Sequence, residues 1–139
     1  MRFIWLFAGL LLLAPAAIAA EDALSITRSL YIARAHPDGI ALEPAETLRP
    51  GDKVVLVMAW QESPGEPFTL VSEIPRTLAY QRSGDGAVEV SVDGGRRWGR
   101  IGSLRRGNRL AAPEEVTNLR WRIAAAESAT MRSYSAIVR

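Results

Sequence analysis

The side chains best suited to chemistry in this sequence are a cluster of arginines in its second half. Six guanidinium groups fall within 14 residues, at Arg96, Arg97, Arg100, Arg105, Arg106 and Arg109. Guanidinium groups bind carboxylates and phosphates through paired hydrogen bonds, so the cluster is a candidate site for anionic glycans such as lipopolysaccharide or an acidic polysaccharide. The other interpretation, which we favour, is a solvated hairpin at a sheet edge, where its charges deter edge-to-edge aggregation.

The charges of the whole chain are divided unevenly along its length. From Glu21 to Gly95 there are 6 basic and 12 acidic residues, whereas from Arg96 to Arg139 there are 10 basic and 3 acidic residues. Such asymmetry can mark a binding face. It can equally pair strands of opposite charge within one fold.

Few other residues could support catalysis or metal binding. His36 is the only imidazole and the chain has no cysteine, so a zinc site lacks ligands. A Ser-His-Asp triad would have to use this one histidine, and no Gly-x-Ser-x-Gly elbow presents a serine. No local pattern supports a pair of carboxylates for glycoside hydrolysis. We therefore expect no enzymatic activity, no metal and no cofactor, and a small hydrolase with a carboxylate pair brought together by the fold is the remaining alternative.

A compact turn motif overlaps the start of the arginine cluster. Its members are Ser91, Asp93, Gly94, Gly95 and Trp98, which have the spacing of an Asp-box. This motif is known from sialidase-like propellers, where it is a structural hairpin and not the catalytic site. The aspartate can bond the backbone of its own turn, the glycines tolerate positive φ, and the tryptophan can fold over the returning strand. We expect a structural hairpin, and contact with a sugar or calcium is the alternative.

The N-terminus predicts export from the cytoplasm. Residues 1–20 contain a positive charge at Arg2, an apolar run over 3–14 and small residues up to Ala20, which is the pattern of a cleaved secretory signal peptide. The run is shorter than the roughly 20 residues that span a bilayer. No cysteine follows it to carry a lipid anchor. We expect a periplasmic or secreted protein in which residues 21–139 form one domain, with no membrane span and no nucleic-acid partner.

The rest of the sequence alternates apolar and polar residues in short segments between Pro, Gly and Asp clusters, which predicts an all-β sandwich. We expect about seven antiparallel strands, over residues 24–32, 53–60, 68–71, 78–80, 87–92, 116–123 and 133–138. Turns are expected at residues 36–39 and 49–52. The segment 53–60 is apolar at nearly every position, which predicts a central strand covered on both faces. Helix and strand compete after Pro113, where we expect a single turn and then a strand.

The large aromatic rings are expected to fill the core. They are Trp60, Trp98, Trp121, Tyr31, Tyr80 and Tyr134. A sandwich without disulfides needs large buried side chains, because nothing else supplements its core. Exposed rings in one plane would instead form a platform for carbohydrate.

Four segments along the chain form an ordered set. They are Leu48–Val54, Ile74–Tyr80, Ser91–Trp98 and Val116–Trp121, with the sequences LRPGDKV, IPRTLAY, SVDGGRRW and VTNLRW. In this order they resemble the bacterial conserved-repeat domains of the domain-of-unknown-function-eleven type, over roughly residues 24–139. The resemblance implies an immunoglobulin-like β-sandwich that occurs singly or in tandem in envelope and surface proteins and has no catalytic activity.

The chain departs from that family at two turns. The family's Asn-x-Gly turn after the second strand is replaced by Trp60–Gly65, and its Pro-Gly-x-Ser-Gly turn before the last strand is replaced by Ala125–Ala129. The cysteine pair of antibody domains is absent as well. We expect a non-catalytic, exported structural or interaction module of the bacterial cell envelope, with an envelope protein as its partner. Binding of anionic envelope glycans through the arginine cluster is the alternative function.

Overall fold

The computed structural model describes residues 24–61, 65–84 and 87–139, so the expected signal peptide, residues 1–20, lies outside the described residues. Within these ranges the fold is all-β and antiparallel, as the alternating pattern predicts. The strands are β1 Thr27–His36, β2 Gly39–Pro44, β3 Lys53–Ala59, β4 Phe68–Glu73, β5 Leu78–Ser83, β6 Glu89–Ser91, β7 Arg105–Arg106, β8 Arg109–Leu110, β9 Asn118–Ile123 and β10 Met131–Val138. A single 3₁₀ turn, η1 Pro113–Glu115, precedes β9.

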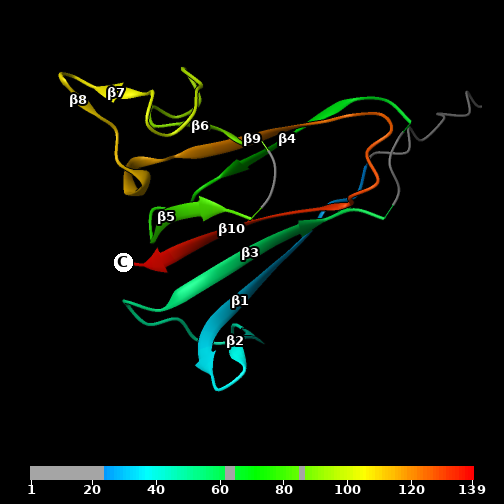
Figure 1. Cartoon of the computed structure of the whole chain (residues 1–139), viewed down its shortest axis with the longest axis vertical. Coiled ribbons are helices and arrows are strands. Elements are labelled where there is room, and N and C mark those ends of the chain that lie inside the picture. The colour runs from blue at the N-terminus through cyan, green and yellow to red at the C-terminus, as the bar shows by residue number, and fades with distance from the viewer. Residues whose placement is uncertain (1–23, 62–64, 85–86) are drawn as a thin grey trace, which may run out of the picture.

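These strands form two main sheets and a small hairpin. The larger sheet has the order β2–β1–β3–β10–β5, the smaller has the order β4–β9–β6, and β7 pairs only with β8. Figure 1 shows the smaller sheet alongside the β5–β10 side of the larger one, with the β7–β8 hairpin at the end of the molecule near β6. A strand is present at each of the seven expected places, and β2, β7 and β8 are additional.

The core is built from side chains that alternate strands aim at one face. In the larger sheet one row crosses four strands through Ile32, Val54, Ala136 and Tyr80, each at most 5% exposed. The smaller sheet contributes alternate positions of β4 and β9, which are buried while their neighbours are more exposed. This two-residue period follows from the pleat of a strand. The rows of both sheets join in one hydrophobic cluster.

Four of the six expected core rings lie in that cluster. They are Trp60, Trp121, Tyr80 and Tyr134, each at most 4% exposed. Trp60 meets Phe68 edge to face, with ring centres 5.4 Å apart. Trp98 and Tyr31 are half-buried and lie outside the core cluster. Core filling is therefore confirmed for four rings, and these four are not available as a carbohydrate platform.

The segment after Pro113 is a strand, as expected. The 3₁₀ turn η1 is one turn long, and β9 then buries Leu119, Trp121 and Ile123 in alternation. β9 pairs along its whole length with β4 on one side and through residues 118–120 with β6 on the other. A helix in this segment could not form backbone pairs with β4 and β6, so it could not occupy the middle of the smaller sheet.

The central position of β3 is confirmed, but its full covering on both faces is wrong. β1 and β10 flank it, and Val54 and Met58 are fully buried on the core side. Val55 and Val57 on the opposite face are only half-buried. Side chains of the adjacent strands cover that face in part, because β-branched residues pack well against in-sheet neighbours. The apolar run therefore predicts more burial for the outer face of β3 than the structure shows.

The expected turn at residues 36–39 joins β1 to β2, an edge strand that the sequence pattern does not reveal. His36 lies opposite Gly39, which leaves two residues for the turn itself. The exposed fractions of Ile40 and Leu42 are 67% and 49%, so the apolar residues of β2 do not join the core. With Gly39 and Pro44 at its two ends, the segment gives a weak strand signal.

Replacement of Leu70 tests which face of β4 lies against the core. Leu70 is 1% exposed, whereas the next residue, Val71, points outward and is 46% exposed. Leu70→Ala removes buried methyl groups and leaves a cavity, so we expect the free energy of unfolding to fall by about 2–5 kcal/mol. The matched control, Val71→Ala, should cost about 0.5 kcal/mol or less. Urea denaturation followed by tryptophan fluorescence measures both losses, and equal losses would contradict this register.

Candidate functional site

The Asp-box residues lie in one closed turn after β6. The Val90 amide donates a hydrogen bond to the Gly99 carbonyl at 2.7 Å, and the Gly99 amide donates back at 3.0 Å. This pair of bonds joins the two ends of the loop. Gly94 and Gly95 have φ angles of 76° and 90°, which residues with a side chain rarely adopt. The turn therefore favours glycine at both positions.

The Asp93 carboxylate organises the inside of the turn. Its Oδ1 accepts hydrogen bonds from the Arg96 amide at 3.1 Å, the Arg97 amide at 2.9 Å and the Ser91 hydroxyl at 2.8 Å. The Ser91 hydroxyl oxygen accepts in turn from the Gly95 amide at 2.9 Å. The Arg97 amide, followed by the Ser91 hydroxyl, lowers the pKa of Asp93 below its ordinary value. Asp93 therefore stays ionised while it fixes the backbone that carries the first two arginines of the cluster.

Trp98 fastens the turn to the outer side of the smaller sheet. Its Nε1 donates to the Gly95 carbonyl at 2.9 Å, and the guanidinium of Arg120 on β9 lies 4.4 Å from the centre of its ring. Arg120 also forms an ion pair with Glu89 at 3.0 Å. The arginine thus lies against both an aromatic ring and a carboxylate, two groups that attract a cation.

Glu115 forms ion pairs with two of the six arginines, Arg109 and Arg106. Its carboxylate accepts two hydrogen bonds from Arg109, one of them at 2.8 Å, and lies 3.6 Å from Nε of Arg106. It also accepts from the Ala112 amide at 2.7 Å. The Arg109 guanidinium, followed by the Ala112 amide, lowers the pKa of Glu115 from 4.5 to about 2. Arg106 additionally donates to the Val92 carbonyl at 3.0 Å, so both arginines support the β7–β8 hairpin.

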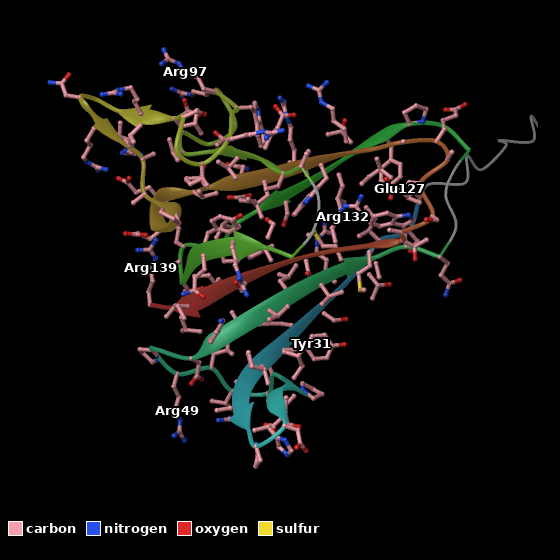
Figure 2. The ribbon with its side chains drawn as sticks, in the orientation of Figure 1. Tyr31, Arg49, Arg97, Glu127, Arg132 and Arg139 are labelled. Atoms are coloured by element: carbon pink, nitrogen blue, oxygen red, sulfur yellow. The ribbon has the colours of Figure 1, made fainter. Side chains whose placement is uncertain are left out.

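The other four arginines of the cluster have no ion pair within the described part of the chain. They are Arg96, Arg97, Arg100 and Arg105, and all four are exposed. Arg105 donates to the Asn108 carbonyl at 3.0 Å, which leaves its charge uncompensated. Figure 2 shows Arg97 at one end of the molecule and Arg49 at the other. The cluster therefore divides into two supporting arginines and four that present positive charge to solvent.

Three arginines of the cluster line a pocket between the Asp-box turn and β7. The pocket has a volume of about 430 Å³, and its lining includes Arg97, Arg105, Arg106, Asp93, Val92 and Leu104. Leu104 packs closely on Gly99, where a Cβ atom would lie 3.0 Å from the leucine Cδ2. The sequence shows the arginines but does not show that they share a pocket with Val92 and Leu104, because that arrangement depends on the fold.

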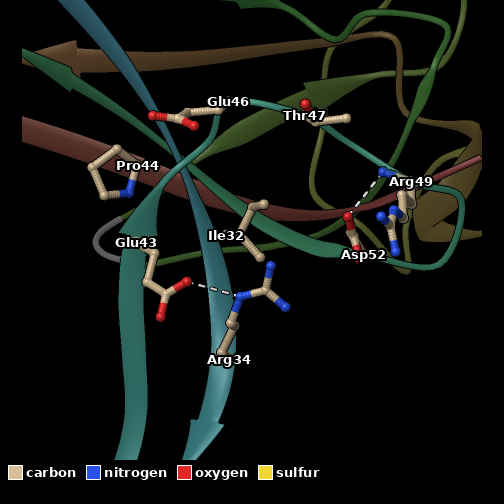
Figure 3. A pocket seen from close by; sticks show the side chains of 8 residues that line it. All are labelled: Ile32, Arg34, Glu43, Pro44, Glu46, Thr47, Arg49 and Asp52. Carbon is tan, nitrogen blue, oxygen red and sulfur yellow. Dashed lines mark hydrogen bonds and ion pairs between the residues drawn. The ribbon is translucent and has the colours of Figure 1, made fainter.

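A second pocket of about 370 Å³ lies at the β1–β2 end of the larger sheet, and sequence reasoning does not single it out (Figure 3). Its charged lining comprises Arg34, Glu43, Glu46, Arg49 and Asp52. Arg34 donates to Glu43 at 2.8 Å, and the Arg49 amide donates to Asp52 at 2.9 Å. Because three carboxylates face two arginines, this pocket is poorly suited to an anion.

One further arginine is buried, a feature that sequence reasoning also misses. Arg132 on β10 is 7% exposed, and its guanidinium lies 3.5 Å from the Glu127 carboxylate (Figure 2). A buried charge is costly unless it is paired, which explains the contact. Arg132 lies on the same side of β10 as the buried Tyr134. The alternating pattern of this strand could therefore have predicted that Arg132 is buried. We assign this pair a structural role.

The described ranges contain neither a cluster of metal ligands nor a membrane-spanning helix. No group of three or more His, Cys, Asp or Glu side chains there could hold a metal ion. His36 is exposed, and its Nδ1 accepts a weak hydrogen bond from the Asp38 amide at 3.3 Å. No helix in the same ranges is long and apolar enough to cross a bilayer.

Comparisons of the chain with family models, with curated proteins and with solved structures find no match. Function is therefore inferred from the site itself, since a fold alone does not determine an activity.

Removal of the Asp93 carboxylate tests whether it orders the turn. In Asp93→Ala the amides of Arg96 and Arg97 lose their acceptor, so we expect their exchange with solvent to speed up by about tenfold or more. Asp38→Ala, which removes an exposed aspartate from the β1–β2 turn, should leave both amides unchanged. Hydrogen exchange followed by NMR measures the two rates, and slow exchange in Asp93→Ala would mean that another acceptor holds the turn.

Replacement of Glu115 tests whether its carboxylate anchors the β7–β8 hairpin. The test uses pH, because the stability that the carboxylate contributes depends on its ionisation. The pKa of Glu115 is lower in the folded protein, about 2, than its ordinary 4.5, so the unfolded chain takes up the proton first as pH falls. The stability that Glu115 contributes is therefore complete above about pH 4.5 and is lost towards about pH 2. We expect Glu115→Gln to be less stable than the parent at pH 7. The difference in the free energy of unfolding between the two should narrow below pH ~4.

The matched control for this experiment is Glu114→Gln, because Glu114 is exposed and has no ion pair among the described residues. Its difference from the parent should stay small and constant with pH. Urea denaturation at several pH values between ~2.5 and 7 measures both differences. If the difference in the free energy of unfolding between Glu115→Gln and the parent did not change with pH, anchoring of the hairpin by the Glu115 carboxylate would be contradicted.

Proposed function

We propose that this chain is a non-catalytic interaction module of the bacterial cell envelope, exported to the periplasm or the cell exterior by a cleaved signal peptide. The pattern of residues 1–20 supports export. The β-sandwich-like fold supports a binding role, because strand edges and loops are presented on a rigid core. The four ordered segments support membership of the conserved-repeat family, with its immunoglobulin-like strand arrangement and its place in the envelope.

The observation that carries this proposal is an ordered display of unpaired arginines. Asp93 fixes the backbone of Arg96 and Arg97, and Glu115 anchors the hairpin that carries Arg105. Cations on an ordered backbone lose less conformational freedom when they bind than cations on a loose tail. Clustered charge of one sign also attracts partners of the opposite sign. The surface formed by these arginines therefore suits an acidic partner, such as an acidic region of an envelope protein.

Binding of anionic envelope glycans is a second candidate function, and the arginine-lined pocket favours it. The pocket of about 430 Å³ brings Arg97, Arg105 and Arg106 together at one place. Convergent guanidinium groups are well suited to the carboxylate, phosphate or sulfate groups of lipopolysaccharide and acidic polysaccharides. A flat acidic protein surface would not need a pocket.

The two candidate functions are separated by retention on immobilised heparin and lipopolysaccharide. A glycan-binding module should be retained at low salt and released as salt rises, and Arg97→Ala/Arg105→Ala should elute at markedly lower salt. The control Arg49→Ala/Arg82→Ala removes the same charge from two exposed arginines elsewhere and should elute close to the parent. A protein-binding module should instead co-purify with an envelope protein from its own cells.

Loss of that co-purification in Arg97→Ala/Arg105→Ala but not in the control would support the acidic protein partner. The proposal of an interaction module through this surface would be contradicted if both double variants behaved like the parent on every matrix and in co-purification.

A further inference from the structure

We propose that the pocket between the Asp-box turn and β7 binds one acidic sugar unit of a polysaccharide, with Arg97 and Arg105 on its acidic group and Asp93 on a hydroxyl. The inference rests on the second candidate function. It adds the chemical class of the ligand and a role for each side chain.

The two arginines provide the anion-binding part of the pocket. Arg97 and Arg105 line it from its two sides, the Asp-box turn and β7, and neither has an ion pair within the described part of the chain. Each guanidinium can present two parallel N–H donors to a carboxylate or sulfate. Arg106 adds positive charge, but its contacts with the Val92 carbonyl and with Glu115 already fix its position. The pocket therefore combines two cations without an ion pair, of which Arg105 also donates to the Asn108 carbonyl, with one that a carboxylate holds in place.

Asp93 makes the pocket selective for a sugar over a simple anion. Its Oδ1 is occupied by three hydrogen bonds, whereas Oδ2 accepts none within the described residues. The low pKa of Asp93 keeps this oxygen negative at neutral pH. A sugar hydroxyl can donate to it, but a phosphate ion without hydroxyl donors is repelled.

The apolar side chains of the pocket suit the face of a sugar ring. Val92 and Leu104 lie in its lining, and Leu104 is supported from behind by Gly99. Small-molecule sites typically combine apolar walls with a few polar groups that fix orientation, in volumes of about 300–1,000 Å³. The volume of about 430 Å³ lies within this range. Val92 is only 6% exposed, so the C–H face of a ring can lie mainly on the half-buried Leu104 while its acidic group reaches the arginines.

NMR titration of the isotope-labelled protein tests the inference with four probes. The probes are a galacturonic acid trimer, a heparin hexasaccharide, the neutral maltotriose and inorganic tripolyphosphate, compared at matched ionic strength because salt screens every charge contact. We expect both acidic oligosaccharides to shift the amides of Arg97, Leu104 and Arg105. Maltotriose should shift none of them, and tripolyphosphate should bind at least about tenfold more weakly than the trimer.

Variants assign the roles of the side chains. Arg97→Ala and Arg105→Ala should each weaken binding of the galacturonic acid trimer by about tenfold, whereas Arg49→Ala, at the opposite end of the molecule, should not change it. Asp93→Asn keeps the size of the side chain and removes its charge. It should therefore strengthen binding of tripolyphosphate and weaken binding of the trimer. Thermal unfolding of each variant checks that its fold is retained.

The possible failures point to different conclusions. If tripolyphosphate binds the parent as tightly as the trimer, or if Asp93→Asn affects both probes alike, the site is a simple anion patch and the sugar assignment is overturned. If acidic oligosaccharides shift only residues outside the pocket, the pocket assignment is overturned while glycan binding stands. If neither acidic oligosaccharide binds at all, the inference is overturned, and retention on immobilised lipopolysaccharide decides the second candidate function separately.

Discussion

The carboxylate of Glu115 is the constraint on which the basic end of the molecule depends. The β7–β8 hairpin has two residues in each strand and pairs with no other strand among the described residues, so its own ladder holds it weakly. The carboxylate binds Arg109 through two hydrogen bonds, approaches Arg106 and accepts the Ala112 amide, which ties the returning end of the hairpin to η1. One acid thereby anchors the hairpin and relieves repulsion within the cluster. It also determines which arginines keep an uncompensated charge.

The uneven charge along the sequence has two structural consequences, ion pairing between strands in one region and uncompensated surface charge in another. Between β6 and β9 the acidic and basic halves pair, because Glu89 forms ion pairs with Arg120 and Arg122. Beyond the Asp-box turn the basic residues outnumber the acids that can reach them, so positive charge remains at the surface. The same arginine-rich half of the chain thus stabilises one sheet and supplies the proposed binding surface.

Local patterns predict much of this fold, because strands and tight turns are encoded over a few residues. The alternation in 116–123 favoured a strand over a helix, and β9 buries Leu119, Trp121 and Ile123 as that pattern requires. The bonds from Asp93 to its own turn follow from the Asp-box spacing. The pocket could not be predicted, because it depends on how the turn and β7 approach each other. The division of the arginines also depends on the tertiary position of Glu115, which no spacing rule assigns.

Glu115 restrains Arg109 and Arg106, whereas Arg97 and Arg105 have no ion pair among the described residues. The most direct test is NMR of the arginine side-chain Nε–Hε groups in the protein without a ligand. Restrained guanidinium groups exchange their protons slowly and rotate slowly, whereas solvated ones exchange rapidly. We expect slow exchange for Arg109 and Arg106, rapid exchange for Arg97 and Arg105, and release of Arg109 in Glu115→Gln, while Arg106 keeps its bond to the Val92 carbonyl. Equal, rapid exchange at all four arginines, unchanged by the Glu115 substitution, would contradict the claim.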